Sequence, residues 1–314
     1  MSNKPSLLVI VGPTAVGKTQ LSIHLAHALE GQIINGDSMQ VYQGLDIGTG
    51  KIQAQEMEEV PHHLLDIKKP DQAFNASDFK SLAQTAIQEI SQEGSLPILV
   101  GGTGLYIEGL LYDLEFGRHQ SVDPTVREKL ADRLEAEGSQ VLWQELQQKD
   151  PQAAAKIPYQ NSRRLIRALE VIETSGQLFS SQTHFAQRES AYNYLVLVLN
   201  RDRQKLYERI NQRVDQMLSQ GLEAEVKTLV DQAQGQSFQS LAGIGYKEWL
   251  PYFAGQVDYQ SVVETIKRNS RRYAKRQLTW FRNRLIHPVW VDMDRDLDQI
   301  LAELVPIIKE ALGK

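Results

Sequence analysis

The chain has 314 residues, no cysteine, and a formal net charge of −5 at pH 7. The lack of cysteine excludes disulfide bonds, thiolate catalysis and cysteine-ligated zinc, and no apolar run reaches the roughly 20 residues that a membrane-spanning helix needs. The fractions of hydrophobic residues, 41%, and charged residues, 23%, are ordinary for a globular protein. We therefore expect a cytoplasmic protein without a signal peptide, built as one large core with a smaller inserted or appended unit.

The first motif, G-P-T-A-V-G-K-T at residues 12–19, joins an apolar run over 7–11 to a helical pattern over 20–29. This is a complete P-loop signature in the context that it requires. The glycines let backbone N–H groups converge on phosphate oxygens, and the following helix adds the positive end of its dipole. We predict that Lys18 reaches the terminal phosphates and that Thr19 holds Mg²⁺. The predicted phosphate-binding residues are Gly12, Pro13, Thr14, Ala15, Val16, Gly17, Lys18 and Thr19.

A short strand is predicted over residues 32–35, and it leads into G-D-S-M-Q-V-Y at 36–42. Open α/β sheets bind ligands at the carboxyl ends of their strands, so Asp37 is expected beside the phosphate site. The alternative interpretation of Asp37 is an aspartate that caps the next turn.

Residues 44–61 contain glycines and a cluster of glutamates without periodicity, which predicts a mobile surface loop. Residues 62–67 predict another strand. Because side chains alternate along a strand, His62 and His63 would lie on opposite faces, and we interpret both as structural rather than metal-binding.

A buried parallel strand is predicted over 96–100, and it runs into G-G-T-G-L-Y at 101–106. The glycines allow a ligand to approach the backbone, and Thr103 is the only hydroxyl at the tip. The strand ends without the acid that orients magnesium and the attacking water in nucleotide hydrolases, which weakens an ATPase interpretation.

Residues 115–192 show polar helical patterns without a strand pattern, which predicts an all-helical insertion domain between core segments 1–114 and 193–314. The predicted fold class is α/β, with a P-loop NTPase-like three-layer core around a parallel sheet. Within the insertion, a helix is predicted from Asn161, with Arg163, Arg164 and Arg167 on one side. Three arginines without an acid among them suit a phosphodiester backbone.

The sheet is predicted to resume over 194–199, followed by a helix with Arg209 and Arg213 one turn apart. A last long helix over 262–284 carries eight basic residues against the acid Glu264, which predicts a local basic face. Three residues that recur every seven positions on it are interpreted as core anchors: Ile266, Tyr273 and Trp280.

Over nearly its whole length the chain resembles the bacterial tRNA dimethylallyltransferases, the IPP transferase family. The resemblance is carried by the P-loop and seven further blocks: 36–42, G-L-D-I-G-T at 44–49, V-P-H-H-L at 60–64, 101–106, R-R-L-I-R-A-L-E-V at 163–171, G-I-G-Y-K-E at 243–248 and Y-A-K-R-Q-L-T-W-F-R at 273–282. It implies transfer of a dimethylallyl group from dimethylallyl diphosphate to N6 of the adenosine on the 3′ side of the anticodon. Departing diphosphate needs charge stabilisation and no water-activating acid, which agrees with the strand end at residue 100.

The resemblance also implies roles for particular residues. Asp37 is the base that takes the amine proton, Thr103 meets the reaction centre, and Arg209 binds the diphosphate, with Arg213 as the second candidate. Val16 stands where the family commonly has serine, at a position where only the backbone is needed. The implied contacts to the tRNA anticodon stem-loop are Asp37, Ser38, Met39, Gln40, Thr103, Thr125, Gln160, Asn161, Ser162, Arg163, Arg164, Lys275, Arg276, Trp280 and Arg282.

Three other classes stay open from the sequence. A small-molecule kinase would use the same loop with ATP, and an isopentenyltransferase acting on free adenine nucleotides would share the active site without needing the insertion or the basic helix. A non-catalytic RNA-binding P-loop protein would have no use for Asp37. Nothing in the sequence demands more than a monomer.

Overall fold

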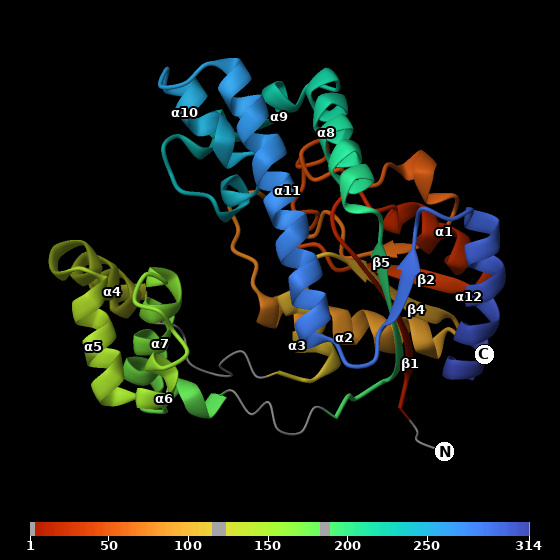
Figure 1. The fold of residues 1–314 in the computed structure, drawn as a ribbon, viewed down its shortest axis with the longest axis horizontal. Coiled ribbons are helices and arrows are strands. Elements are labelled where there is room, and N and C mark those ends of the chain that lie inside the picture. The colour runs from red at the N-terminus through yellow and green to blue at the C-terminus, as the bar shows by residue number, and fades with distance from the viewer. Residues whose placement is uncertain (1–3, 115–123, 183–188, 314) are drawn as a thin grey trace. The chain divides into compact units, whose positions relative to one another are not determined.

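The computed structural model describes residues 4–114, 124–182 and 189–313. Its centre is a six-stranded sheet in the order β3-β2-β4-β1-β5-β6, in which every strand pairing is parallel (Figure 1). The predicted parallel α/β sheet is therefore confirmed. The strands are β1 Ser6–Val11, β2 Gly31–Asn35, β3 His62–His63, β4 Leu96–Gly101, β5 Asn193–Asn200 and β6 Val289–Asp292.

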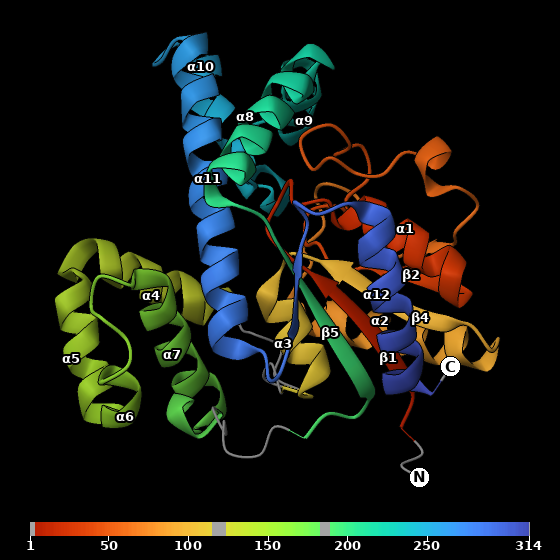
Figure 2. The same cartoon turned by 45° about the vertical axis from the view of Figure 1, so that its right-hand side comes forward.

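Alternating side chains of the central strands build two separate cores, one on each face of the sheet. In β1, Leu7 and Val9 belong to one core, and Leu8 and Ile10 belong to the other. This follows from the two-residue period of a strand when both faces are covered. Two helices, α2 (Ala76–Gln92) and α3 (Gly104–Leu111), cover the first face. Two others, α1 (Lys18–Leu29) and α12 (Leu297–Leu312), cover the second face (Figure 2). The predicted three-layer core is confirmed.

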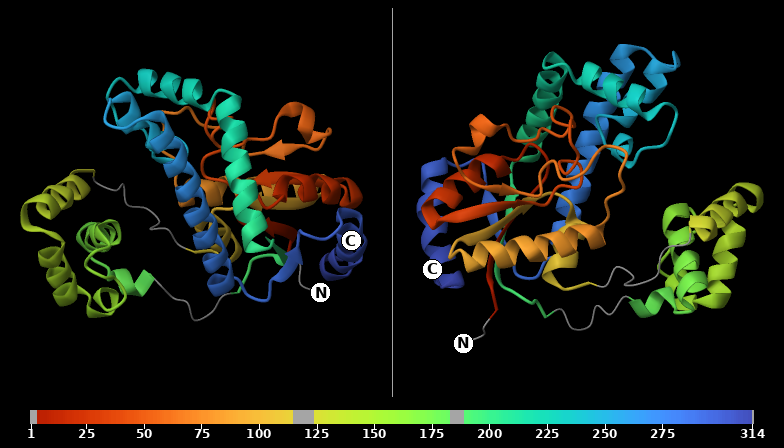
Figure 3. Two further views of the ribbon diagram at one scale, coloured as in Figure 1. Left: turned by 45° about the horizontal axis from the view of Figure 1, so that its top comes forward. Right: turned by 180° about the vertical axis from the view of Figure 1, so that it is seen from behind.

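The helices of the unit formed by Met1–Leu114 and Ser190–Lys314 cover both faces and the carboxyl edge of the sheet. Helices α8 (Arg203–Ser219) and α11 (Tyr259–Arg284) run side by side (Figure 3). Lys267 of α11 pairs with Asp215 of α8 at 2.6 Å. The described helices include none with the length and hydropathy to cross a bilayer. The α-helices are α1 Lys18–Leu29, α2 Ala76–Gln92, α3 Gly104–Leu111, α8 Arg203–Ser219, α9 Leu222–Ala233, α10 Leu250–Phe253, α11 Tyr259–Arg284 and α12 Leu297–Leu312.

Residues Glu115–Glu189 form a second compact unit, separate from the unit made by Met1–Leu114 and Ser190–Lys314. The described elements of this second unit are all helical, and they enclose a core of their own that includes Leu142, Leu165 and Leu169. They are α4 Pro124–Glu137, α5 Ser139–Lys149, α6 Pro151–Ala154, α7 Ser162–Ser175 and the 3₁₀ turn η2 Phe179–Gln182.

The segment after the second unit joins the core slightly earlier than the predicted residue 193. Lys4 Nζ donates to the carbonyl of Ser190 at 2.8 Å, and Tyr192 is buried against the first unit. These contacts place residues 190–192 with the core.

Strand β3 is shorter than the predicted 62–67. Leu64 and Asp66 adopt φ values of 63° and 54°, which are left-handed and cannot continue a strand. His62 Nδ1 lies 2.8 Å from the carbonyl of Val60, and His63 Nε2 lies 2.8 Å from Gln32 Oε1. The two histidines therefore have structural partners, as interpreted from the sequence.

Candidate active site

The P-loop connects β1 to α1 at the carboxyl edge of the sheet. Ala15 and Gly17 have φ values of 64° and 110°, which curl the chain, and α1 begins directly after Gly17. Glycine has no side chain to cap a helix, so the first amides of α1 stay available to an anion. Lys18 Nζ donates to the carbonyls of Gly12 and Pro13 at 3.0 and 2.9 Å. The ammonium group is thus held at the loop itself.

The charge of Lys18 depends on the groups that surround it. Burial lowers the pKa of Lys18 to about 8, Arg213 acts in the same direction, and Asp37 opposes both. Because burial disfavours the charged form of Lys18, an anionic ligand beside it would favour the ammonium.

Asp37 lies where the sequence places it, beside the P-loop and just after β2. Its carboxylate is near enough to oppose the lowering of the pKa that burial causes in Lys18 and in Arg213. Asp37 Oδ1 also accepts a hydrogen bond from the amide of Met39 at 2.8 Å. The turn-capping interpretation of Asp37 is therefore confirmed, and the carboxylate also lies within electrostatic reach of the two cations.

The loops after β2 and β4 touch through their glycines. A side chain on Gly101 would collide with the backbone of Gly36, and the amide of Gly36 donates to the carbonyl of Val100 at 2.7 Å. This approach brings Thr103 Oγ1 within 3.2 Å of the amide of Ser38, from which it accepts a hydrogen bond. Thr103 and the turn that carries Asp37 are thus neighbours.

Arg209 lies on α8 and contacts the P-loop from an exposed position. Its Nε donates to the carbonyl of Ala15 at 3.0 Å. Burial and the neighbouring Arg201 lower the pKa of Arg209.

Arg213 lies one turn further along α8, and it is half-buried with Lys18 and Asp37. Its Nη2 donates to the carbonyl of Thr49 at 3.1 Å. Burial lowers the pKa of Arg213, and Asp37 acts against that shift. Of the two arginines, Arg213 shares its surroundings with the predicted base and the P-loop lysine.

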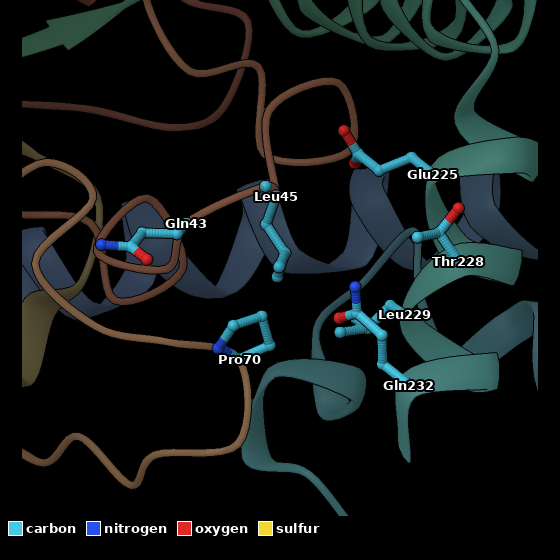
Figure 4. Close-up of a pocket in the computed structure, with 8 residues that line it drawn as sticks. Gln43, Leu45, Pro70, Glu225, Thr228, Leu229 and Gln232 are labelled. Carbon is cyan, nitrogen blue, oxygen red and sulfur yellow. The ribbon is translucent and has the colours of Figure 1, made fainter. Parts of the chain in front are cut away.

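The loop over residues 44–51, whose Thr49 carbonyl accepts from Arg213, is anchored by helix α9. The sequence instead predicts that residues 44–61 form a mobile loop. The carboxylate of Glu225 on α9 accepts hydrogen bonds from the amides of Asp46, Ile47 and Gly48 at 2.9, 2.7 and 2.9 Å. The hydroxyl of Tyr246 donates to the same carboxylate at 2.6 Å. Figure 4 shows Glu225 reaching from α9 toward this loop, beside a pocket between them.

A buried lysine fastens the end of the same loop. Lys51 Nζ donates to the carbonyl of Tyr42 at 2.8 Å and forms ion pairs with Asp46 and Asp66 at 2.6 and 2.5 Å. The loop over 44–51 is therefore tied at several points.

Helix α11 carries the predicted basic face, although part of its charge is used internally. Lys267 pairs with Asp215, Arg271 donates to Asn211 at 2.6 Å, and Arg284 lies 3.5 Å from buried Glu108. The exposed basic side chains lie on one side of the helix, and we call them the basic stripe. The basic stripe consists of Arg268, Arg272, Lys275, Arg276 and Arg282.

The three predicted core anchors of α11 differ in burial. Ile266 is buried, whereas Tyr273 and Trp280 are half-buried. Trp280 packs directly on Gly104, where any side chain would collide with its ring. Tyr273 lies against Thr103 and near Asp37, so it faces the candidate site rather than only the core.

In the helical unit, Asn161 caps α7 by accepting from the amide of Arg164 at 3.3 Å. Arg163 and Arg164 are exposed, as is Thr125 on α4; Gln160 and Ser162 flank the cap. The sequence interpretation that Arg167 is without an acidic partner is wrong. Its Nη1 pairs at 2.8 Å with Glu170, which is fully buried, so Arg167 compensates an internal charge.

Sequence reasoning missed Glu225 and Gln277, both of which hold loops of this site. Each residue acts through backbone groups far away in the sequence, so no local motif marks its role. The i, i+4 spacing of Tyr273 and Gln277 was the available signal that both lie on one face of α11.

Three comparisons with known proteins agree. A family model described as IPP transferase matches residues 40–284. The chain is 50% identical over 300 residues to the tRNA dimethylallyltransferase of Bacillus subtilis, with 96% of this chain and 95% of that relative covered. The relative from Enterococcus faecalis, which has the same name, is 48% identical over 307 residues, with 97% of this chain and 98% of that relative covered.

Solved structures give the same result. The full-length tRNA isopentenylpyrophosphate transferase from Bacillus halodurans is 47% identical with a TM-score of 0.75, and the match covers 99% of this chain and 97% of that chain. A eukaryotic dimethylallyltransferase acting on tRNA is 30% identical with a TM-score of 0.79, and the match covers 97% of this chain and 77% of that chain.

Proposed function

This chain belongs to the IPP transferase family, and we propose that it transfers a dimethylallyl group from dimethylallyl diphosphate to N6 of the adenosine on the 3′ side of the anticodon in tRNA. The observation that carries the proposal is that Asp37, just after β2, lies within electrostatic reach of Lys18 in the P-loop and of Arg213 on α8. A carboxylate suits the removal of a proton from an amine, and the two cations suit a departing diphosphate.

The donor is bound through its diphosphate. The backbone amides at the start of α1 and the ammonium of Lys18 neutralise the phosphate oxygens. Lys18 then exchanges its bonds to Gly12 and Pro13 for bonds to the diphosphate. Arg213 supplies the second charge from α8, and Arg209 adds a contact at the outer edge of the loop. Both arginines are proposed diphosphate ligands, and Arg213 is the one within electrostatic reach of Asp37.

Mg²⁺ fits this site as a partner of the diphosphate. Thr19 supplies an exposed hydroxyl oxygen at the start of α1, a donor type that Mg²⁺ accepts. Among the described residues no group of His, Asp and Glu is arranged to hold a metal ion without help, so the remaining ligands would be phosphate oxygens and water. When bound, the ion supplies further neutralisation of the leaving group.

In the transfer step, N6 of adenosine attacks the first carbon of the allyl group while the carbon–oxygen bond to diphosphate breaks. Asp37 accepts the proton that N6 loses, and the electron pair of the broken bond leaves with diphosphate. Thr103, which accepts from the amide of Ser38 at 3.2 Å, is placed to hold the adenine beside Asp37. Holding the reactants in this arrangement supplies much of the rate.

The tRNA is bound by basic and polar groups of both units. The basic stripe supplies Lys275, Arg276 and Arg282, and the start of α7 supplies Arg163 and Arg164. Such contacts hold the backbone while the adenine is splayed from its neighbours into the site. The further proposed contacts are Asp37, Ser38, Met39, Gln40, Thr103, Thr125, Gln160, Asn161, Ser162 and Trp280.

We also propose that the protein acts as a monomer in the cytoplasm. The residues Asp37, Lys18 and Arg213 lie within one compact unit of the chain, formed by Met1–Leu114 and Ser190–Lys314. The location is inferred from the substrate, because tRNA is a cytoplasmic molecule. Light scattering on the purified protein in the presence of tRNA tests the monomer.

The reaction is tested by incubating the protein with Mg²⁺, dimethylallyl diphosphate and unmodified tRNA, followed by mass analysis of the digested nucleosides. The expected product is adenosine from tRNA that carries an added C5H8. Parallel reactions contain free AMP or ATP. Modification of AMP alone would favour an enzyme of free nucleotides, and consumption of ATP alone would favour a kinase.

A further inference from the structure

The side chain of Gln277 connects the two loops on which the proposed reaction depends. It lies on α11 and is only 5% exposed. Its Nε2 donates to the carbonyl of Gly102 at 2.9 Å, and its Oε1 accepts from the amide of Thr14 at 3.1 Å. Thr14 belongs to the P-loop, and Gly102 precedes Thr103.

Both ends of the Gln277 amide are used, one as donor and one as acceptor. A carboxylate of the same shape could accept from Thr14 but could not donate to Gly102, where two oxygens would then face each other. The fit is also tight, because any side chain on Gly102 would collide with the Gln277 amide. This combination of shape and polarity is specific to glutamine at this position.

Neighbouring residues of α11 bear on the same loop. Tyr273, one turn before Gln277, lies against Thr103, and Trp280, about one turn after it, packs on Gly104. Lys275 and Arg276 of the basic stripe directly precede Gln277 in the chain, and their side chains are exposed. One helix therefore carries both the proposed tRNA contacts and the bridge between the loops.

We propose that Gln277 is a positioning residue that fixes the separation between the diphosphate-binding loop and the loop that carries Thr103. The inference rests on the proposed function, since it assumes that the P-loop holds the donor and that Thr103 holds the acceptor. Bond formation requires the allyl carbon and N6 to approach within about 3–3.5 Å, so a small change in loop separation is costly to the rate.

The test compares two variants of the full chain, Gln277→Glu and Gln277→Met, with the wild type. The measurements are the single-turnover rate of transfer at saturating tRNA and dimethylallyl diphosphate, the Kd of each substrate, and the urea midpoint of unfolding. Gln260→Glu is the matched control, because Gln260 lies exposed on the same helix. We expect both Gln277 variants to lose roughly 10- to 100-fold in rate while each Kd changes by less than about threefold, and the control to match the wild type.

Each outcome decides the inference. An unchanged rate in both variants, with an active wild type, would overturn the role of Gln277 and leave the proposed function standing. A loss of cooperative folding in both variants, or a rate loss matched by a weaker Kd, would make Gln277 a structural or binding residue and also overturn the inference. An inactive wild type would instead refute the proposed function.

Discussion

The P-loop over residues 12–19 and the loop over residues 44–51 both contain glycines, and each accepts a hydrogen bond from an arginine of α8, at Ala15 from Arg209 and at Thr49 from Arg213. They differ in whether their backbone amides have a partner within the chain. In the P-loop, Lys18 donates to carbonyls of its own loop, and the amides at the start of α1 have no capping side chain. In the second loop, Glu225 accepts from the amides of Asp46, Ile47 and Gly48.

Side chains of the same chain also fill the space beside two glycines of the second loop. The ring of Tyr246 lies where a side chain on Gly48 would be, and the guanidinium of Arg213 lies against Gly50. A cluster of backbone amides attracts an anion in either loop. The difference is that one anion is a carboxylate of the same chain, whereas the other is left to a ligand. We therefore expect the first loop to govern activity and the second to govern stability and the position of Arg213.

The largest effect is expected at Asp37, the proposed base, which lies within electrostatic reach of Lys18 in the P-loop and of Arg213 on α8. Asp37→Asn retains the shape and the hydrogen bond to Met39 but cannot accept the amine proton. We expect transfer to slow by roughly 10³- to 10⁴-fold with tRNA affinity nearly unchanged. Single-turnover rates and filter binding measure the two quantities. Near-normal turnover would remove Asp37 as the base.

Lys18→Met removes the ammonium from the P-loop and keeps an unbranched side chain of comparable length. Since Lys18 is the cation closest to the loop carbonyls, we expect a loss of roughly 10²- to 10³-fold in kcat/KM for the donor. The urea midpoint should stay within the error of the wild type. A large loss of stability with normal activity would invert the comparison of the two loops.

Arg213→Lys tests the hydrogen bond between α8 and the loop over residues 44–51. A lysine retains the charge but cannot donate to the carbonyl of Thr49 in the same fork geometry. We expect roughly a 10- to 100-fold loss in kcat/KM, larger than that of Arg209→Lys in a parallel assay. If Arg209→Lys were the more damaging variant, the assignment of the two arginines would be reversed.

The pH dependence of kcat/KM for the donor reports the charge of Lys18 in the free enzyme. Burial lowers the pKa of Lys18 to about 8, so the cation is present below that pH and is lost as the pH rises through it. We expect kcat/KM to fall about tenfold per pH unit above this value. Steady-state rates at limiting donor measure the profile, and Lys18→Met should abolish the break near pH 8. A break that survives in that variant belongs to another group.

Glu225→Gln is expected to have the smallest effect on activity and a clear effect on stability. The amide places an N–H group against the loop amides and removes the charge that they share. We expect about 1–3 kcal/mol less free energy of unfolding, with activity reduced only a few-fold. Urea denaturation measures the change, and Asp231→Asn, exposed on the same helix, is the control. Equal stability of the two variants would mean that the loop does not need its anchor.

Sequence reasoning was accurate where a local pattern has only one structural solution. The P-loop, the strand before Asp37 and the buried strand before Gly101 lie where they were predicted, because apolar periodicity and glycine spacing act over a few residues. It was wrong where distant groups intervene. Glu225 and Lys51 anchor the segment predicted to be mobile, and Glu170 pairs with an arginine interpreted as free for RNA.

The sequence by itself determined the chemistry that is available: a phosphate-binding loop, a carboxylate after the next strand, a hydroxyl on a glycine loop and a basic helix. Only the tertiary structure decided which groups meet. It brought Arg209 to the carbonyl of Ala15 and Arg213 within electrostatic reach of Asp37, and it set the Gln277 amide between Thr14 and Gly102. The physical reason is that these contacts depend on how helices α8 and α11 pack across the sheet edge, and packing depends on side chains far apart in the chain.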